Sequence, residues 1–464
     1  MLPTKVHKKA SGRRPRRLNR RFILGCCLLL FIVIFALVLK PYLFSRSDPF
    51  PNESGLLDIS AELQDQKDPE SKVLVLEKAL KRSVERLEQA QKENAKLMDE
   101  RNQAVDALEH AAAVNAFRRS FDAKETVNAT DEDAVNSKEV LVGRQQTAVI
   151  QPNRLLLPIL VICHARSDYL RRTLDTLIKY RPSSDQFPII VSQDGTDEGV
   201  WKLLTEDFKD KVFSIQNKDR KAPTNLKSWE KPSYYYIAAH YYFALHTVFD
   251  LLKYRAVVIV EEDLEVAPDF FEYFSSLLPF LESAPDIYAV SAFNDNGQSE
   301  FVKNPQVLRR SNFFPGLGWM MTRRLWKELG PKWPAATGYW DDWMREPEQR
   351  QGRDTIFPEV SRTYTFGAAG ASGGQFFEAH LAKIKLNEEF VPFSTMDFNF
   401  LKKENWEKYL NTTLLHSVEI DRVSSISKYQ DRTLTLRYDN MNGFKHLASS
   451  LGIMSDEKVN AYHQ

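Results

Sequence analysis

AVVIVEED, the stretch Ala256–Asp263, decides the fold, because an apolar run rich in branched residues ends there in three acids. Two similar runs precede it, LLLPILVI at Leu155–Ile162 and FPIIVSQDG at Phe187–Gly195. Apolar residues at helical spacing separate the runs, over Tyr169–Ile178 and within Tyr234–Leu252. Apolar strands that alternate with helices indicate a parallel sheet covered on both faces. The sequence therefore predicts an α/β fold.

Polar side chains follow each of the three runs. They are Arg166 after the first, Asp194 at the end of the second, and Glu261, Glu262 and Asp263 at the end of the third. Ligands of parallel sheets bind beyond the carboxyl ends of the strands. We therefore expect the three polar groups to meet at one edge of the sheet.

The three adjacent acids point to a cation. Neighbouring carboxylates repel one another, and burying them is costly unless a positive charge is near. Mg²⁺ or Mn²⁺ would resolve this and would keep positions for the oxygens of a diphosphate. The alternative is a solvated acidic turn at a strand exit. No GxxxxGK[ST] or GxGxxG follows the first strand, which disfavours P-loop and dinucleotide-binding proteins.

A second candidate region combines aromatic residues with carboxylates. It runs from FFPGLGW at Phe313–Trp319, through Trp333, to WDDW at Trp340–Trp343. Aromatic rings beside carboxylates suit sugars, and a sugar hydroxyl that attacks an anomeric carbon needs a general base. Asp341 and Asp342 are the candidates for that base. The alternative is an aromatic core with a capping acid.

The N-terminus sets the predicted topology of the chain. The 464 residues are 43% hydrophobic with a net charge of +1, which excludes disordered, collagen-like and multispanning membrane proteins. Residues 1–21 carry nine Lys or Arg and no acid, and residues 22–39 are an uncharged apolar run. That run suits a bilayer span of roughly 20 residues and exceeds the about 7–15 of a signal peptide. We expect a cytoplasmic tail, one transmembrane anchor and a lumenal remainder, with no nucleic-acid partner.

The lumenal part is predicted to divide into a stem, residues 40–150, and a catalytic domain, residues 151–464. From about 73 to 108 the apolar residues follow a heptad pattern, and Asn94 holds a position that typically fixes register and oligomeric state. We expect a parallel homodimer through this coiled coil. A single solvated helix is the alternative.

Cysteine use is sparse. Cys26 and Cys27 lie in the apolar run, so Cys163 is the only lumenal cysteine and an intrachain disulfide there is excluded. Cys163 ends an apolar strand, which predicts a buried thiol rather than a nucleophile.

Longer strings are more specific than these patterns. They include VEEDLEVAPDFFEYF at Val260–Phe274, FNDNGQ, SNFFPGLGWMM, YWDDWMREPEQRQGR and GQFFEAHLAKIKLN. In them the sequence resembles the N-acetylglucosaminyltransferase I family, glycosyltransferase family 13, over nearly all of residues 155–454. The resemblance does not extend to the basic tail or the coiled coil.

The resemblance implies a GT-A fold, in which a Rossmann-like nucleotide-binding half adjoins an acceptor-binding half. It implies an inverting, Mn²⁺-dependent transfer of GlcNAc from UDP-GlcNAc to the α1,3-linked mannose arm of Man5GlcNAc2 N-glycans, in β1,2 linkage. A Golgi membrane protein of type II topology is expected. The nearest alternative is the related enzyme that acts on protein O-mannose, and an alternative of another class is a catalytically silent coiled-coil Golgi tether.

The resemblance also assigns roles to individual residues. Asp263 matches the metal-binding carboxylate, Asp341 the catalytic base, and Ser372 the loop that closes over the diphosphate. The remaining matches concern the donor: Glu261 and Glu262 would face its ribose and sugar, and the nucleotide-binding positions are Arg166, Asp194 and His240.

Three features depart from the family pattern. Glu262 stands where the family commonly has Asp. His164 and Gly195 stand where relatives pair cysteines, so the fold must be held without that bridge. The segment KWPAATGYWDD is about two residues longer before Asp341, which predicts a different acceptor pocket.

The stem generates a first prediction. Removal of residues 70–110 from the lumenal chain is expected to convert a dimer into a monomer, because the heptad seam supplies the contact between copies. Sedimentation measurements of the two forms test this. A monomer in both forms would refute the dimer.

Overall fold

The computed structural model describes residues 156–454, apart from 222–223, 225, 229, 369, 371–373, 375 and 430, together with parts of the segment 71–112. The tail 1–21, the apolar run 22–39 and much of the predicted stem lie outside the described residues. None of the helices described is long and apolar enough to cross a membrane.

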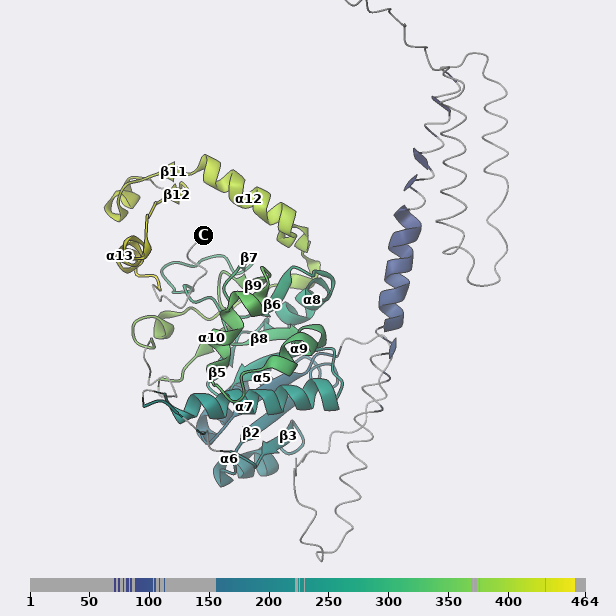
Figure 1. Cartoon of the computed structure of the whole chain (residues 1–464), viewed down its shortest axis with the longest axis vertical. Coiled ribbons are helices and arrows are strands. Elements are labelled where there is room, and N and C mark those ends of the chain that lie inside the picture. The colour runs from purple at the N-terminus through teal and green to yellow at the C-terminus, as the bar shows by residue number, and fades with distance from the viewer. Residues whose placement is uncertain are drawn as a thin grey trace, which may run out of the picture. The chain divides into compact units, whose positions relative to one another are not determined.

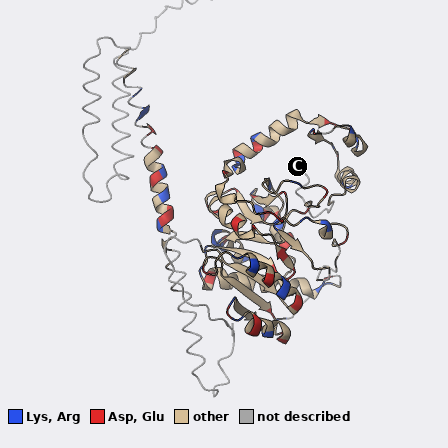
Figure 2. Cartoon of the chain, turned by 180° about the vertical axis from the view of Figure 1, so that it is seen from behind, with Lys and Arg blue, Asp and Glu red and all other residues tan. Residues whose placement is uncertain are grey.

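The described residues of the segment 71–112 are helical, and nearly all are exposed. Basic and acidic residues alternate along the continuous part of this helix (Figure 2). Apolar side chains on it are also exposed, with Leu97 at 61% and Leu108 at 71%. The predicted helix is confirmed, and its pairing with a second copy stays a prediction.

The three apolar runs form neighbouring parallel strands, as predicted. Strand β1 (Ile159–Cys163) lies between β2 (Ile189–Asp194) and β4 (Ala256–Glu261). The helices expected between them are α5 (Ser167–Tyr180) and α7 (Pro232–His246). In this half of the sheet, the strand that flanks β2, β3 (Phe213–Asn217), was not predicted.

The central sheet has eight strands in the order β3-β2-β1-β4-β8-β6-β9-β7. Strands β7 and β8 run antiparallel to their neighbours, so the sheet is mixed. Its first four strands form the Rossmann-like half, and the rest extend it into a second half (Figure 1). This is the GT-A-like α/β architecture that the resemblance implied. The strands of the second half are β6 (Ile287–Ser291), β7 (Leu308–Ser311), β8 (Trp319–Thr322) and β9 (Asp354–Pro358).

A hydrophobic core lies on each face of the sheet. On one face Leu174 of α5 and Phe274 of α8 (Phe270–Ser283) pack in one buried cluster. On the other, Tyr241 of α7 and Trp326 of α9 (Arg323–Leu329) belong to a second cluster. Burial on both faces explains why β1 is apolar along its length and why β4 is apolar up to Glu261.

Smaller elements complete the unit. A two-stranded ribbon pairs β5 with β10, and a segment with α12 and α13 reaches beyond β7 at the C-terminal end (Figure 1). The remaining elements are α6 (Glu198–Lys202), β5 (Leu264–Val266), α10 (Trp340–Arg345), α11 (Pro347–Arg350), β10 (Thr363–Thr365), α12 (Lys403–His416), β11 (Val418–Glu419), β12 (Leu434–Thr435) and α13 (Met441–Leu451).

A buried ion pair joins Arg362, the residue before β10, to Asp269, the N-cap of α8. Arg362 and Asp269 are fully buried, and the guanidinium Nη2 donates to Asp269 Oδ2 at 3.0 Å. Asn387 donates to the other carboxylate oxygen at 2.9 Å. A buried charge pair is tolerated only when its remaining polar groups are also satisfied, as they are here.

Breaking this pair is expected to destabilise the fold. Asp269→Ala leaves a buried guanidinium without its carboxylate, which costs about 3–5 kcal/mol. The exposed pair Arg437–Glu419 provides the control, because removal of Glu419 should cost only about 0–1 kcal/mol. Urea unfolding of Asp269→Ala and Glu419→Ala measures both. Equal stability of the two variants would contradict the prediction.

Candidate active site

The polar residues that follow β1, β2 and β4 meet at one edge of the sheet, as the sequence predicted. Arg166 Nε lies 2.7 Å from Glu262 Oε1, and its Nη2 lies 3.0 Å from Asp263 Oδ2. One guanidinium therefore joins the end of β1 to two of the three acids after β4. This pairing offsets the repulsion between those acids.

Glu262 is the most buried of the three acids. Its second carboxylate oxygen accepts a hydrogen bond from the backbone N–H of His164 at 3.0 Å. Burial raises the pKa of Glu262, while Arg166 works to lower it. Both oxygens of Glu262 are thus engaged within the protein, so the side chain holds Arg166 in place. Its contact with a donor sugar stays a prediction.

Glu261 points to the other side of the strand. Tyr241 donates a hydrogen bond from its hydroxyl to Glu261 Oε1 at 2.6 Å. Burial, together with the negative charges of Asp263 and Asp341, raises the pKa of Glu261 to about 7. Tyr241 was not predicted as a site residue, although it is the residue after His240 in the chain. The feature that could have indicated Tyr241 is its position as an aromatic residue on the same predicted helix as His240.

Asp194 is held by two side chains, one at the end of β3 and one in the loop after it. Asn217 Nδ2 donates to Asp194 Oδ1 at 3.1 Å, and Arg220 Nε lies 2.9 Å from Asp194 Oδ2. Burial raises the pKa of Asp194, and the charge of Arg220 counteracts this. The guanidinium of Arg220 also lies 4.0 Å from the ring centre of Tyr236. Arg220 was missed because it stands in a charged stretch with no spacing that marks it.

His240 lies behind the second strand. It is 2% exposed, and its Nε2 is 2.8 Å from the hydroxyl of Ser192 on β2. Burial lowers the pKa of His240 to about 3, so the imidazole is neutral at ordinary pH. In this position it braces β2 beneath Asp194. Its contact with a nucleotide stays a prediction.

Asp341 stands in the first turn of α10, with its side chain 38% exposed. Arg345 Nη1, one turn later, lies 3.0 Å from Asp341 Oδ2 and 3.1 Å from Asp342 Oδ1. Trp340, the residue before Asp341, stacks on Tyr241 at 4.1 Å, and the Tyr241 hydroxyl donates to Glu261 at 2.6 Å. The structure therefore brings the predicted base close to the acids at the end of β4.

The aromatic residues around Asp341 form a stacked core. Trp340 stacks on Tyr241 with ring centres 4.1 Å apart, and on Trp319 and Trp333 at 5.9 Å each. All three tryptophans are less than 10% exposed. For these rings the alternative of an aromatic core is correct, and a sugar platform is not. The core fixes the position of α10 against α7.

The segment before Asp341 makes a tight turn. Gly338 and Tyr339 both have left-handed backbones, with φ of 72° and 52°. A bulky residue with a left-handed backbone is strained by about 1–3 kcal/mol, so contacts with its surroundings must stabilise it. Tyr339 is held by stacking on Tyr234 at 4.6 Å. The longer segment therefore adds an aromatic pair beside α10.

A glycine-rich loop packs directly against Asp263. The backbone N–H of Phe366 donates to the Asp263 carbonyl at 3.0 Å. A Cβ on Gly367 would lie 2.2 Å from Asp263 Oδ2, so only glycine fits there. Ser372, predicted from the same loop, lies outside the described residues.

His164 and Gly195 lie side by side where relatives pair cysteines. His164 Nδ1 is 2.5 Å from the carbonyl of Asp194, and a Cβ built on Gly195 would lie 3.6 Å from the His164 ring. A hydrogen bond thus joins β1 to β2 where the bridge was expected. Cys163 is free and 3% exposed, and burial raises the pKa of its thiol. The buried-thiol prediction is confirmed.

The acids fit a divalent cation that shares its ligands with a substrate. Among the described residues, no group of three or more His, Cys, Asp or Glu side chains could hold a metal by itself. Asp263, with Glu261 nearby, supplies one or two carboxylates. Mg²⁺-like ions are commonly bound in this way, with phosphate oxygens and water completing the shell. The residues therefore fit a metal that arrives with a nucleoside diphosphate.

An acidic edge of a Rossmann-like half, faced by a separate half-exposed carboxylate, is typical of nucleotide-sugar-dependent glycosyltransferases. The comparison with known proteins identifies the class and the family. The GNT-I family matches residues 57–461, and the chain belongs to that family. The resemblance read from the sequence is thus confirmed, and the chain is a glycosyltransferase.

One curated relative is the alpha-1,3-mannosyl-glycoprotein 2-beta-N-acetylglucosaminyltransferase of Arabidopsis thaliana. It is 36% identical over 338 residues, which cover 71% of this chain and 75% of that protein. Solved structures that match are more distant. TarS of S. aureus in complex with UDP-GlcNAc is 11% identical, with a TM-score of 0.31 over 56% of this chain and 66% of that one. The mannosyltransferase PcManGT of Pyrobaculum calidifontis, in complex with GDP-Man and Mn2+, is 14% identical, with a TM-score of 0.28 over 56% and 69%. Scores this low establish no close structural relationship.

Gly367 provides a sharp test of the site. Gly367→Ala places a methyl group against Asp263 and should lower kcat/KM at least about tenfold, a loss of about 1.4 kcal/mol. Gly370→Ala in the same loop is the control, since a Cβ there meets nothing within 4 Å. Steady-state measurement of kcat/KM for the two variants tests this prediction. Similar losses in both would show that loop mobility, not the contact with Asp263, explains the effect.

Proposed function

We propose that the chain transfers GlcNAc from UDP-GlcNAc to the α1,3-linked mannose arm of Man5GlcNAc2 N-glycans, forming a β1,2 linkage with inversion. The observation that carries this proposal is the placement of Asp341 beside the acids of β4, in a chain of the GNT-I family. Donor-binding and acceptor-activating groups thus meet at one place. The name of the Arabidopsis relative supports the same acceptor and linkage.

The donor is proposed to bind at the edge formed by β1, β2 and β4. Asp194, oriented by Asn217 and Arg220, presents a carboxylate suited to the hydroxyls or base edge of a nucleoside. Asp263 is proposed to hold Mn²⁺, which would stabilise the negative charge of the leaving UDP. Arg166 holds the carboxylates of Asp263 and Glu262 in position beside the proposed metal site.

Asp341 is proposed to act as the general base. A base must lie within hydrogen-bond reach of the proton it takes, and a half-exposed carboxylate is accessible to a mannose hydroxyl. Arg345 holds its orientation through a 3.0 Å contact. The hydroxyl oxygen then attacks the anomeric carbon of GlcNAc as the bond to UDP breaks. A single displacement of this kind inverts the configuration.

The glycine-rich loop is proposed to close over the donor. Its anchor at Phe366 is fixed by the bond to Asp263 and by Arg172, whose guanidinium lies 4.0 Å from the Phe366 ring centre. A closed loop would exclude water that could hydrolyse the donor. Ser372 is proposed to contact the diphosphate in that state.

The cellular setting is also a proposal. Residues 22–39 would anchor the chain in the Golgi membrane as a type II protein, with residues 1–21 in the cytosol. The catalytic domain would then face the lumen, where glycoprotein acceptors pass. The exposed helix of the stem would pair with a second copy.

The role of each carboxylate can be tested by substitution. Asp341→Asn should lower kcat by about 10²–10⁴-fold, because it removes the base. Asp263→Asn should abolish the response to Mn²⁺. Asp342→Asn is the matched control, since Asp342 shares Arg345 but is assigned no proton transfer. GlcNAc transfer from UDP-GlcNAc to Man5GlcNAc2 is the assay.

Two results would count against these roles. Undiminished transfer by Asp341→Asn would exclude it as the base. A larger loss in Asp342→Asn than in Asp341→Asn would move that role to the neighbouring carboxylate.

A further inference from the structure

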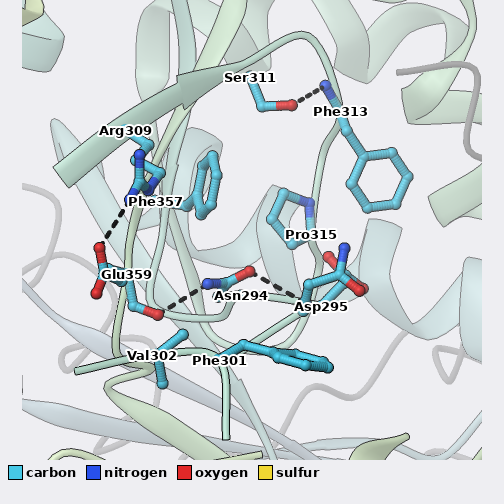
Figure 3. Close-up of a pocket in the computed structure, with 11 residues that line it drawn as sticks. Asn294, Asp295, Phe301, Val302, Arg309, Ser311, Phe313, Pro315, Phe357 and Glu359 are labelled. Atoms are coloured by element: carbon cyan, nitrogen blue, oxygen red, sulfur yellow. Dashed lines mark hydrogen bonds and ion pairs between the residues drawn. The ribbon is translucent and has the colours of Figure 1, made fainter. Parts of the chain in front are cut away.

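A pocket of about 330 Å³ lies beside the active site, between the loop after β6 and strands β7 and β9 (Figure 3). Its walls include Asp295, Phe301, Phe313, Arg309 and Glu359. We infer that this pocket binds a second sugar residue of the glycan acceptor, next to the mannose that reacts. This inference rests on the proposed function and goes further by assigning an acceptor subsite.

A single residue, Arg345, contacts both the pocket lining and the predicted base. Phe313 lines it, and the guanidinium of Arg345 lies 5.0 Å from the Phe313 ring centre. Arg345 also donates from Nε to the carbonyl of Phe314 at 3.2 Å, and it contacts Asp341 at 3.0 Å. A branched glycan whose mannose sits at Asp341 must extend past these residues. The pocket is therefore placed to receive a neighbouring sugar.

Asp295 is the polar group that lacks a protein partner. Among the described residues, no side chain donates a hydrogen bond to its carboxylate, and its only donor is its own backbone N–H. Burial raises the pKa of Asp295 to about 6, with Arg345 acting in the opposite direction. Asp295 is partly exposed and lines the pocket, so its carboxylate is available to accept hydrogen bonds from a ligand that supplies hydroxyl donors.

The rest of the pocket is held in place before any ligand binds. Arg309 and Glu359 form an ion pair at 2.7 Å, and Asn294 donates to the Glu359 carbonyl at 2.8 Å (Figure 3). Phe301 is 41% exposed at the rim, and Phe313 is 8% exposed. Rigid polar groups with aromatic faces and a volume of about 300 Å³ or more are typical of small-molecule sites.

The chemistry of the lining favours a neutral, hydroxyl-rich ligand. An anion would be repelled by Asp295, while the positive charge of Arg309 is already neutralised by Glu359. A sugar offers hydroxyl donors to the carboxylate and an apolar CH face to the rings. A hexose unit of the acceptor meets both requirements.

The test compares a branched acceptor with a minimal one. Man5GlcNAc2 would reach the pocket, whereas methyl α-mannoside, a single mannose unit, would occupy only the reacting position. Asp295→Ala and Phe301→Ala are the test variants. Asp210→Ala and Phe390→Ala are the controls, because Asp210 is exposed and Phe390 is 62% exposed elsewhere on the surface.

Asp295→Ala is expected to raise the KM for Man5GlcNAc2 by about tenfold or more, as loss of a hydrogen bond to a charged group predicts. The KM for methyl α-mannoside and for UDP-GlcNAc should change less than about twofold, the usual effect of a distant surface change. Phe301→Ala should show the same selectivity with a smaller change. The control variants should match the unsubstituted chain on both acceptors.

Two results would overturn the subsite. Equal losses on both acceptors would assign Asp295 to the support of Arg345 and Asp341. Unchanged kinetics on both would show that no sugar occupies the pocket. Absence of transfer to either acceptor by the unsubstituted chain would instead refute the proposed function itself.

Discussion

The repulsion among the acids at the end of β4 is the constraint on which the rest of the site depends. Glu261, Glu262 and Asp263 leave a buried strand together, which is costly without positive charge. Arg166 from β1 neutralises two of them, and Tyr241 from α7 holds the third. The acids therefore require Arg166, which follows β1, and Tyr241 of α7 to lie beside the end of β4. They also leave Asp263 and Glu261 positioned for a cation that a diphosphate would bring.

The features of the fold and the site that depend only on short stretches of the chain could be predicted from the sequence. β1, β2 and β4 begin as apolar runs because both faces of the sheet are buried, and Arg166, Asp194 and the acids stand at or after their carboxyl ends. β8 and β9 were not predicted, because their pairing depends on contacts between distant segments. Arg220 was missed for the same reason, since only the fold brings it to Asp194.

Aromatic residues near a carboxylate supported two interpretations that the sequence could not separate. Burial decides for Trp319, Trp333 and Trp340, which form a core that carries Asp341 toward the acids. Phe301 is an accessible ring beside the pocket, in the loop that begins with the FNDNGQ string noted for family resemblance. Composition alone cannot show which face of a ring is covered, because that depends on tertiary packing.

The central claim is that donor and base converge at one edge for an inverting transfer to an N-glycan arm. Product analysis after incubation with UDP-GlcNAc, Mn²⁺ and an equal mixture of Man5GlcNAc2 and an O-mannosyl peptide tests it most directly. The account predicts a β1,2-linked GlcNAc on the α1,3 mannose arm of the N-glycan. An α-linked product, or preferential modification of the peptide, would contradict it.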